Sequence, residues 1–390
     1  MITLDGSMGE GGGQVLRTAL ALSLVTGEPF VIERIRANRT PPGLKRQHLT
    51  AVLAAAEIGS ARVEGAELGS QRLAFRPGSV RAGAYRFAVG TAGSATLVLQ
   101  TLLPPLLAAG APSSLEVSGG THNPLAPPFE FLQRSFARAL AAMGAPVELH
   151  LVRHGFAPAG GGTILAEVGA ASLRPLELLH REPAGLPRAR VLLANLPPSI
   201  GERELRVVQR RLDLRSDQCR IETVPSHGPG NMVFVEFPGA VVDEIVGVPG
   251  ERRVTSEQVA ERACELAETF VAADVPVGEF LADQLLIPMA MARGGTFRTL
   301  ETLDISQCAN VTWAGMVHLA MLDLTALDLS ETKIDDAAVG SLAGMWRLRM
   351  LNVSRTRMTK AGVDELRRLL PECTISADDL RGADASATRR

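Results

Sequence analysis

The sequence predicts an α/β fold, and three features of the chain indicate it. An apolar strand, a glycine-rich turn and an apolar-periodic helix follow one another several times within residues 1–145. Strands that alternate with helices in this way are typical of α/β architectures. Further along, leucines recur at a fixed step from residue 300 onward, which predicts a separate segment of short repeats.

The composition is that of a folded protein. Of the 390 residues, 46% are hydrophobic and 21% are charged, and the net charge is −2. A chain without a basic excess has no general attraction for nucleic acid, so any such contact needs a local patch. The four cysteines match no zinc or disulfide pattern, which favours a reducing, cytoplasmic location. We expect no signal peptide and no membrane span, and a buried helix at residues 96–109 broken at Pro104 and Pro105.

The first glycine-rich turn, residues 9–13, follows a strand at 2–4 and precedes a helix at 15–25. Backbone N–H groups at such a helix start bind anions, usually phosphate, although the glycines also suit a plain tight turn. Glu10 lies inside the turn, and Arg17 lies about one turn into the helix. A carboxylate beside a phosphate would repel it, so we expect a metal ion or a proton between them.

A basic window lies between a strand at residues 29–32 and a helix at 49–58. It holds five Lys or Arg and one acid around the turn Pro41-Pro42-Gly43. Guanidinium groups fixed by such a turn suit phosphate, so we favour phosphate or RNA backbone over a merely solvated face. His48, at the end of the window, is either a general base or phosphate donor, or a structural histidine at a helix start.

Further strands and helices follow in order. The predicted strands cover residues 73–75, 85–89, 114–118, 147–152, 163–168, 188–194 and 232–237, and the predicted helices cover 129–143 and 200–212. Thr255 and Gln258 form a capping box that begins a helix reaching residue 272. In the turn before residue 129, His122 and Asn123 either bind a ligand or hydrogen-bond the turn itself.

The most specific motif spans residues 154–164. It begins with His154, and Pro158 and three consecutive glycines follow between two apolar runs. Three glycines exceed what a plain strand-to-strand turn needs, so we expect side chains to be excluded there.

Six stretches together resemble the RNA 3′-terminal phosphate cyclase family. They are residues 9–14 with Arg17, 36–48, 93–100, 119–124, 154–164 and 281–284, and the stretch 154–164 is similar to the family's signature. The resemblance covers about residues 1–296. It implies three repeated β-α-β-α-β-β units with a small inserted α/β domain. On this basis we expect the large domain at residues 1–180 and 241–296, and the inserted domain at 181–240.

The resemblance also implies an activity. Members of the family use ATP to convert an RNA 3′-terminal phosphate into a 2′,3′-cyclic phosphate. A histidine first takes AMP from ATP, the AMP passes to the RNA phosphate, and the neighbouring 2′-hydroxyl then displaces it. A divalent metal, Mg or Mn, assists by offsetting phosphate charge.

Roles for individual residues follow from the resemblance. Glu10 would hold the metal. The RNA 3′ end would be held by Arg17, Arg36, Arg39, Arg46, Gln47 and His48. ATP would be bound by Gln100, Phe280, Leu281, Ala282, Asp283 and Gln284. For Gln100 a position on the helix surface, and for Phe280 and Leu281 simple core packing, remain as alternatives.

From residue 297 onward the chain follows a different pattern. Leu303, Leu327 and Leu351 recur every 24 residues, and three neighbouring positions keep the same step. This is the leucine-rich-repeat pattern, which predicts a short solenoid at residues 297–376 that a protein partner could bind. The polar tail, residues 377–390, is expected to be disordered.

The family's nucleophilic histidine is not found in this sequence. It belongs a little beyond Asp283 and Gln284, yet no histidine occurs between His227 and His318. His318 keeps the 24-residue step with Leu342 and Leu366, so we expect it in the repeat core. The alternatives to a cyclase are therefore a catalytically impaired protein that binds RNA ends or nucleotide, and an interaction scaffold that acts through the repeats.

Overall fold

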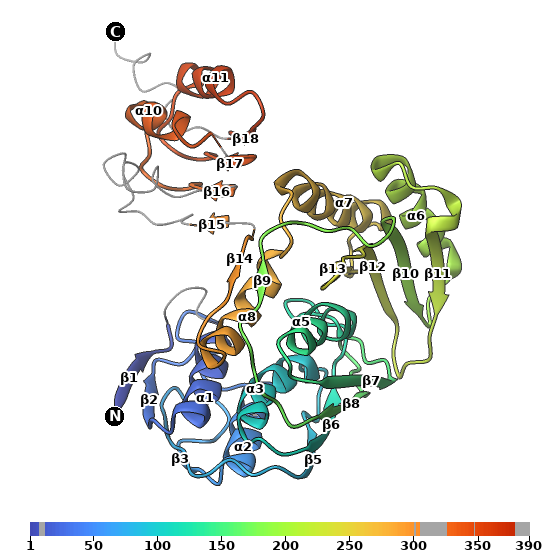
Figure 1. The fold of residues 1–390 in the computed structure, drawn as a ribbon. Helices are drawn as coiled ribbons and strands as arrows, with labels where there is room; N and C mark the ends of the chain where they lie inside the picture. The colour runs from blue at the N-terminus through green and yellow to red at the C-terminus, as the bar shows by residue number, and fades with distance from the viewer. Residues whose placement is uncertain (8–11, 300–301, 305–325, 347, 379–390) are drawn as a thin grey trace. The chain divides into compact units, whose positions relative to one another are not determined.

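A computed structural model describes residues 1–7, 12–299, 302–304, 326–346 and 348–378 (Figure 1). The fold is mixed α/β, and none of the sheets in these ranges closes into a barrel. The chain divides into two compact units, one of Met1–Ala267 with Phe280–Phe297 and one of Glu268–Glu279 with Arg298–Arg390. No helix in the described part of the chain is long and apolar enough to cross a membrane.

The first sheet of the first unit has four strands in the spatial order β1-β2-β4-β3. These strands are β1 (Ile2–Asp5), β2 (Phe30–Glu33), β3 (Arg62–Glu64) and β4 (Leu73–Arg76). The pair β1 and β2 is parallel, and β4 is antiparallel to both of its neighbours. Two helices connect these strands, α1 (Gln14–Thr26) and α2 (Arg46–Ile58).

The second sheet has the order β5-β6-β8-β7, with the same sense of pairing as the first. Its strands are β5 (Ala84–Ala88), β6 (Ser113–Gly119), β7 (Val147–Arg153) and β8 (Gly162–Val168). A helical stretch precedes β7 and consists of α4 (Phe129–Phe131), a π-helical turn η1 (Leu132–Phe136) and α5 (Ala137–Ala142). The predicted helix at residues 129–143 is therefore present, but with a π turn inside it.

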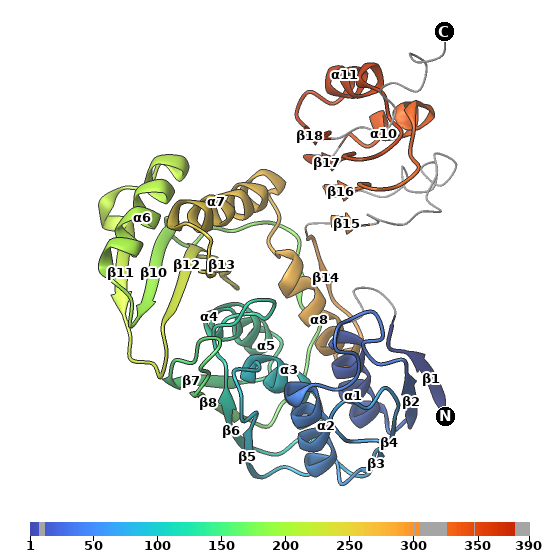
Figure 2. The same cartoon turned by 180° about the vertical axis from the view of Figure 1, so that it is seen from behind.

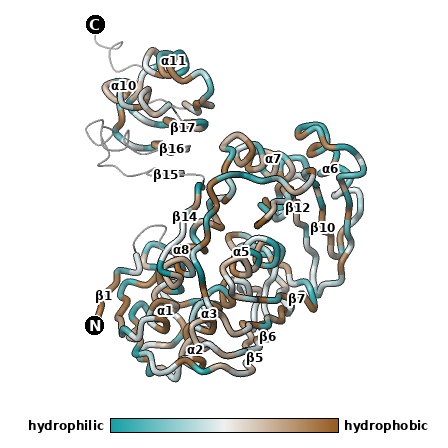
Figure 3. Tube along the Cα trace, in the orientation of Figure 1, coloured by the Kyte–Doolittle hydropathy of each residue, from teal (hydrophilic) through white to brown (hydrophobic). Residues whose placement is uncertain are grey.

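Helix α3 (Ala95–Ala108) corrects one prediction, because it contains Pro104 and Pro105 and continues past them. A proline removes a helical hydrogen bond and costs about 3 kcal/mol in an ordinary helix interior. Every residue from Ala95 to Leu107 is buried, and α3 contacts α1, α2 and β6. Packing on all sides therefore holds the helix where an exposed one would break. The hydropathy colouring of Figure 3 shows this apolar segment inside the first unit.

A third sheet lies in the middle of the chain, in the order β11-β10-β12-β13. Its strands are β10 (Arg188–Ala194), β11 (Cys219–Thr223), β12 (Gly230–Phe237) and β13 (Glu244–Pro249), and η2 (Ser216–Gln218) precedes β11. Helix α6 (Pro198–Leu212) follows β10, and α7 (Ser256–Ala273) follows β13. The capping box of α7 is confirmed, because the Gln258 side chain accepts from Thr255 N–H at 3.0 Å and Thr255 Oγ1 accepts from Gln258 N–H at 3.2 Å.

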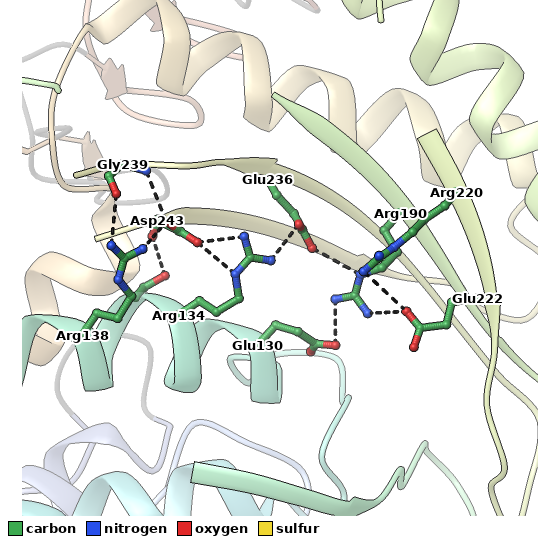
Figure 4. Close-up of polar contacts among 10 residues, drawn as sticks. Glu130, Arg134, Arg138, Arg190, Arg220, Glu222, Glu236, Gly239 and Asp243 are labelled. Carbon is green, nitrogen blue, oxygen red and sulfur yellow. Dashed lines mark hydrogen bonds and ion pairs between the residues drawn. The ribbon is translucent and has the colours of Figure 1, made fainter. Parts of the chain in front are cut away.

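Charged side chains join the helical stretch of residues 129–142 to this third sheet. Glu130, Arg134 and Arg138 point from the helix toward the strands (Figure 4). Arg134 pairs with Glu236 of β12 at 2.7 Å and with Asp243 at 2.7 Å, and Arg138 pairs with Asp243 at 2.5 Å. The helix and the sheet are thus held together by several ion pairs that share their carboxylates.

Arg190 of β10 lies at the buried end of this network. Only 7% of the residue is exposed, and its guanidinium pairs with Glu130 at 2.9 Å and with Glu236 at 3.2 Å. Glu222 of β11 is a third partner at 3.2 Å, and Arg190 also lies over the Phe234 ring. Burial raises the pKa of Glu130, but His122 and Arg190 outweigh it and lower that pKa to about 2. Glu130 is therefore ionised at neutral pH, as the pairing requires.

Glu204 of α6 is a buried carboxyl group that makes no ion pair with any of the described residues. Its Oε2 accepts from Asn231 Nδ2 at 2.9 Å, while its Oε1 is buried without a hydrogen-bond partner. Burial raises the pKa of Glu204 to about 7, although Asn231 and Arg203 oppose the shift. The folded protein therefore favours the protonated acid, whereas the unfolded chain ionises near pH 4.5.

The free energy of unfolding should consequently fall as the pH rises from about 4.5 to about 7, because over this range Glu204 ionises in the unfolded chain but stays protonated in the folded protein. We expect Glu204→Gln to match the wild type near pH 4.5 and to exceed it by up to about 3 kcal/mol at pH 8. Denaturant titration over this pH range measures the difference. Glu202→Gln, on the exposed side of the same helix, is the control and should give parallel curves. A constant offset for Glu204→Gln at all pH values would show that Glu204 is ionised throughout.

The first unit also contains α8 (Glu279–Met291) and a parallel pair of short strands, β9 (Glu177–Leu178) and β14 (Thr296–Phe297). This pair brings together chain segments on either side of the third sheet in the sequence. Figures 1 and 2 show α8 beside α1 from opposite sides.

The second unit contains a parallel sheet whose strands are β15 (Thr302–Asp304), β16 (Ala326–Asp328), β17 (Met350–Asn352) and β18 (Thr374–Ser376). Leu303, Leu327, Leu351 and Ile375 occupy one register position across it. Leu327 and Leu351 are 2% and 1% exposed and pack into one cluster, which Leu342 and Leu366 also join. The helical returns are η3 (Asp336–Ala338), α10 (Val339–Ala343) and α11 (Lys360–Leu369). His318 lies outside the described residues. Four residues that keep the 24-residue step of the repeats also lie outside them, namely Leu300, Ile305, Cys308 and Leu324.

Candidate active site

A pocket of about 780 Å³ opens at the N-terminal end of α1. Three chain segments of the first unit form most of its wall, namely the glycines before α1, the turn after β2 and the first residues of α2. Its polar lining consists of Gln14, Arg17, Thr18, Arg36, Arg39, Thr40, Lys45, Gln47 and His48. Its apolar lining includes Leu4, Leu22, Leu97 and Leu125. The pocket therefore has a cationic end and an apolar wall.

Arg17 is half-buried in this pocket, and no carboxylate within the described residues pairs with it. Burial lowers the pKa of its guanidinium to about 10, so the side chain is still charged at neutral pH. A desolvated cation without a counter-charge is costly unless a ligand supplies the anion. Arg17 thus indicates an anionic ligand in the pocket.

His48 is 4% exposed and stands in the first turn of α2. Its Nδ1 accepts from the Lys45 N–H at 3.2 Å, which leaves the proton on Nε2. Burial, followed by Arg17, Arg36 and Lys45, lowers the pKa of His48 to about 3. His48 is therefore neutral at physiological pH and too weak a base for proton abstraction. It caps the helix with one nitrogen and offers a neutral N–H with the other.

Arg36 shapes the turn that carries the neighbouring cations. Its backbone adopts a φ of 53°, and its Nη1 donates to the carbonyl oxygens of Pro41 and Gly43 at 2.8 and 2.9 Å. Burial and the nearby Arg39 lower its pKa. The guanidinium therefore holds the turn while still lining the pocket beside Arg39.

Gln47 and Arg46 are adjacent in sequence but lie in different surroundings. Gln47 lines the pocket, and its Oε1 accepts from the Ser94 N–H at 3.0 Å, which ties α2 to the start of α3. Arg46 is exposed and is not part of the pocket lining. Five of the six residues predicted for the RNA end therefore line one pocket, and Arg46 does not.

Gly13 is required by space rather than by backbone angle. It precedes α1 with a φ of −91°, which any residue can adopt. A Cβ at this position would lie 2.4 Å from His48 Nε2 and 2.7 Å from Arg17 Nη1. A side chain here would thus push apart the two groups that face the pocket.

We expect Gly13→Ala to weaken binding of a 3′-phosphorylated oligonucleotide at least tenfold, because His48 and Arg17 must move about 1 Å to admit the methyl group. Gly12→Ala is a matched control, since a Cβ at Gly12 meets nothing within 4 Å. Fluorescence anisotropy with both variants measures the effect. Equal affinities for the two variants would mean that His48 and Arg17 do not act at this position.

The residues predicted to bind ATP lie on α3 and α8. Gln14, at the start of α1, donates to Asp283 Oδ2 at 3.2 Å, so the glycine-rich turn and the 281–284 motif are neighbours. Phe280 is 58% exposed, which leaves a ring face open for stacking, whereas Leu281 is fully buried and packs in the core. Ala282 and Gln284 are half-buried.

Gln100 is 9% exposed, so the alternative interpretation of Gln100 as a residue on the helix surface is wrong. Its Nε2 is buried and has no hydrogen-bond partner among the residues that the structure describes. A buried amide donor in this condition costs about 1–3 kcal/mol unless a ligand or water accepts from it.

Comparison with known proteins identifies the family. The family model for RNA 3′-terminal phosphate cyclase matches residues 8–314. The chain belongs to this family. A protein of Ectopseudomonas mendocina (strain ymp) named RNA 3′-terminal phosphate cyclase is 51% identical over 299 residues, which are 76% of this chain and 87% of that protein. One of Koribacter versatilis (strain Ellin345) with the same name is 54% identical over 303 residues, which are 77% of this chain and 85% of that protein.

The solved structure of the enolpyruvyl transferase NikO from Streptomyces tendae is a far weaker match. The match covers 44% of this chain and 33% of the NikO chain, with 17% sequence identity and a TM-score of 0.26. We draw no conclusion from so slight a likeness. The resemblance to the cyclase family that the sequence indicated is confirmed by the family match and the two curated relatives.

The stretch of residues 154–164, which is similar to the family's signature, is a site of close backbone packing. A Cβ at Gly155 would lie 2.4 Å from the Gly162 nitrogen and 2.5 Å from the Gly119 carbonyl oxygen. Of the three consecutive glycines, a Cβ at Gly160 would lie 2.8 Å from Ala92 Cα and one at Gly162 would lie 2.6 Å from the Gly155 nitrogen, whereas one at Gly161 would meet the His227 ring at 2.4 Å. The expected exclusion of side chains is therefore confirmed at all three positions.

His154, the first residue of this stretch, and the neighbouring His122 are held by protein contacts. His122 is 1% exposed and bonds Thr121 Oγ1 at 2.8 Å and Glu130 Oε2 at 2.9 Å. His154 stacks on His122, and burial lowers the pKa of His154 to about 4. Asn123 donates to the carbonyl oxygen of Ala92. These contacts favour the interpretation of His122 and Asn123 as residues that hold the turn.

The predicted metal ligand Glu10 lies outside the described residues, and so does His318, which was expected in the repeat core. Within the described ranges, no group of three His, Cys, Asp or Glu side chains could hold a metal ion. Gln14 and Leu125 are among the pocket residues to which the sequence assigned no role. Gln14 stood in the first glycine motif and could have been found there, whereas nothing in the sequence distinguishes Leu125.

Proposed function

We propose that this chain uses ATP to convert the 3′-terminal phosphate of RNA into a 2′,3′-cyclic phosphate. The observation that carries this proposal is Arg17, a half-buried cation in the pocket without a carboxylate partner among the described residues. A phosphate monoester supplies the missing negative charge, and Arg39 and Lys45 line the same pocket. The relatives named RNA 3′-terminal phosphate cyclase support the same reaction.

The pocket supports the binding steps of that reaction. Arg17 and Arg39 would hold the oxygens of the RNA phosphate by charge, and the neutral Nε2–H of His48 would donate a hydrogen bond. The phosphate receives AMP from ATP with loss of pyrophosphate. The 2′-hydroxyl then attacks the activated phosphorus, loses its proton and displaces AMP, which closes the cyclic phosphate.

The ATP side of the proposal rests on α3 and α8. The unpartnered Nε2 of Gln100 suits an acceptor on the nucleotide, and the exposed ring of Phe280 suits the face of adenine. Asp283 lies beside the glycine-rich turn through its contact with Gln14 and could accept from ribose hydroxyls. A divalent ion, Mg or Mn, held at Glu10 would offset phosphate charge.

A second function is favoured by the positions of the histidines. Of the six histidines within the described residues, His48 alone lines the pocket, and its pKa of about 3 makes it a weak nucleophile. The second proposal is therefore a protein that binds RNA 3′ ends and ATP without taking AMP onto a histidine. Incubation with α-labelled ATP and Mg²⁺ separates the two, because an acid-labile protein–AMP adduct supports the cyclase and ligand binding without an adduct supports the second proposal.

The cyclisation itself tests the first proposal. The full chain is incubated with ATP, Mg²⁺ and an oligoribonucleotide whose 3′-terminal phosphate carries the label. We expect the label to become resistant to phosphatase while ATP is converted to AMP, as a cyclic ester requires. No resistant product at any enzyme concentration, with the oligonucleotide bound, would reject cyclisation and leave the binding function.

We further propose how the chain is organised. The common strand order of the first two sheets supports repeated β-α-β-α-β-β units, with a third unit around β9, α8 and β14. The inserted domain begins near residue 181 and extends past 240, because β13 (Glu244–Pro249) pairs with β12. The 24-residue register of β15 to β18 and the buried leucines support a leucine-rich-repeat solenoid at residues 297–376.

The remaining proposals concern partners and location. RNA 3′ ends are the proposed nucleic-acid partner, and the repeats would offer a surface to a protein partner. The spread cysteines support a cytoplasmic location.

A further inference from the structure

Leu125 is the most unusual apolar side chain in the described part of the first unit. It is 97% exposed, more than any other large hydrophobic residue there, and its backbone adopts a φ of 59°. A leucine in the left-handed region is strained by about 1–2 kcal/mol, and an exposed leucine gains nothing from burial. Neither property helps the folded chain by itself.

The turn that carries Leu125 is fixed on both sides. Before it, Asn123 donates to the carbonyl oxygen of Ala92, and after it, Thr96 Oγ1 donates to the carbonyl oxygen of Pro127 at 2.8 Å. The Phe129 N–H also bonds the Thr121 carbonyl oxygen at 3.1 Å across the base of the turn. Leu125 is therefore presented by an anchored turn.

Leu125 lines the same pocket as Arg17, Arg39 and His48. Leu97, Leu22 and Leu4 continue the apolar side of the lining. None of the residues predicted to bind ATP, Gln100 or those at 280–284, is among the described residues that line it. The apolar wall therefore contacts the same ligand whose anionic group lies against Arg17 and Arg39.

A nucleotide at the 3′ end of RNA has the matching chemistry. Its phosphate is anionic, and the base carried by the same ribose offers a flat π-face on which an apolar side chain can pack. We propose that Leu125 packs against the terminal nucleoside of the RNA whose 3′-phosphate lies at Arg17 and His48. This inference rests on the proposed function and assigns a base-contacting residue to it.

The test compares two oligoribonucleotides that differ only in the terminal base. Both end in a ribose 3′-phosphate, but one carries the base and the other is abasic. We expect the wild type to bind the base-bearing form about tenfold more tightly, and Leu125→Ser to bind both with the weaker affinity. Leu125→Asn, which tolerates the left-handed backbone, should lose the same preference without loss of thermal stability.

Leu68→Ser is the matched control, since Leu68 is 52% exposed in another turn and is not part of the pocket lining. It should keep the full preference for the base. A Leu125→Ser variant that keeps this preference would overturn the inference, and so would a variant that loses affinity for ATP instead of for the base. Failure of the wild type to bind either oligonucleotide would overturn the proposed function, and the inference with it.

Discussion

Replacement of Arg17 with Ala is expected to weaken binding of a 3′-phosphorylated oligoribonucleotide by about a hundredfold. A charge-assisted hydrogen bond to phosphate contributes about 1.5–3 kcal/mol, and the upper end applies because Arg17 is already desolvated in the free protein. Binding of the same oligonucleotide with a 3′-hydroxyl should change much less. Anisotropy titrations at one fixed salt concentration measure both affinities, since phosphate contacts depend on salt.

Arg46→Ala provides the matched control for charge. Arg46 is exposed and lies outside the pocket lining, so its loss removes the same charge without touching the pocket. We expect a change of threefold or less, about equal for the two oligonucleotides. Equal losses for Arg17→Ala and Arg46→Ala would mean that RNA is held by general surface charge and not by the pocket.

The second large effect is expected at Arg190. Arg190→Met should destabilise the protein by about 3–5 kcal/mol, because it leaves the buried carboxylates of Glu130 and Glu236 short of their shared cation. Methionine keeps much of the side-chain volume, so the loss reports charge more than packing. The shift in the urea midpoint of the third sheet, followed by a probe on that sheet, measures it.

Arg220→Met tests whether the effect is specific to the buried end of the network (Figure 4). The Arg220 side chain is 70% exposed and lies 3.9 Å from Glu222. An exposed pair at this distance contributes at most about 0.5 kcal/mol. If Arg190→Met shifted the midpoint no more than Arg220→Met, the network would be incidental to the fold.

Much of the regular structure could be predicted because it depends on local pattern. The strand at residues 188–194 matches β10 residue for residue, and the Thr255–Gln258 capping box forms both of its hydrogen bonds. The predicted break in α3 was wrong for a non-local reason. Pro104 and Pro105 disfavour a helix in isolation, but their burial on every side is a property of the folded unit.

The site could be predicted only where one motif supplies several residues. Arg36, Arg39, Gln47 and His48 lie within one short window, and the fold keeps them at one pocket. The unpartnered amide of Gln100 and the anchored, left-handed Leu125 depend on neighbours far away in sequence. The sequence names Gln100 through the family resemblance but cannot show that its amide is unpartnered, and it does not name Leu125, so the structure was needed for both observations.

The nucleophilic histidine that the family resemblance implies beyond Asp283 and Gln284 has no counterpart there in this sequence. The sequence predicts no nucleophile between His227 and His318, and the described histidines are either held by protein contacts or lie outside the pocket, except His48. The labelled-ATP experiment therefore decides between a cyclase and a binding protein, and either result leaves the phosphate pocket in place.

Selectivity for the RNA terminus tests the pocket most directly. The wild-type chain is titrated with one oligoribonucleotide sequence in three forms that carry a 3′-phosphate, a 5′-phosphate or no terminal phosphate. Because the half-buried cation of Arg17 and the N–H of His48 would both contact a terminal phosphate at the 3′ position, we predict that the 3′-phosphorylated form binds at least tenfold more tightly than the other two. Equal affinity for the 3′- and 5′-phosphorylated forms would contradict the account, since the pocket would then read total charge and not the RNA 3′ end.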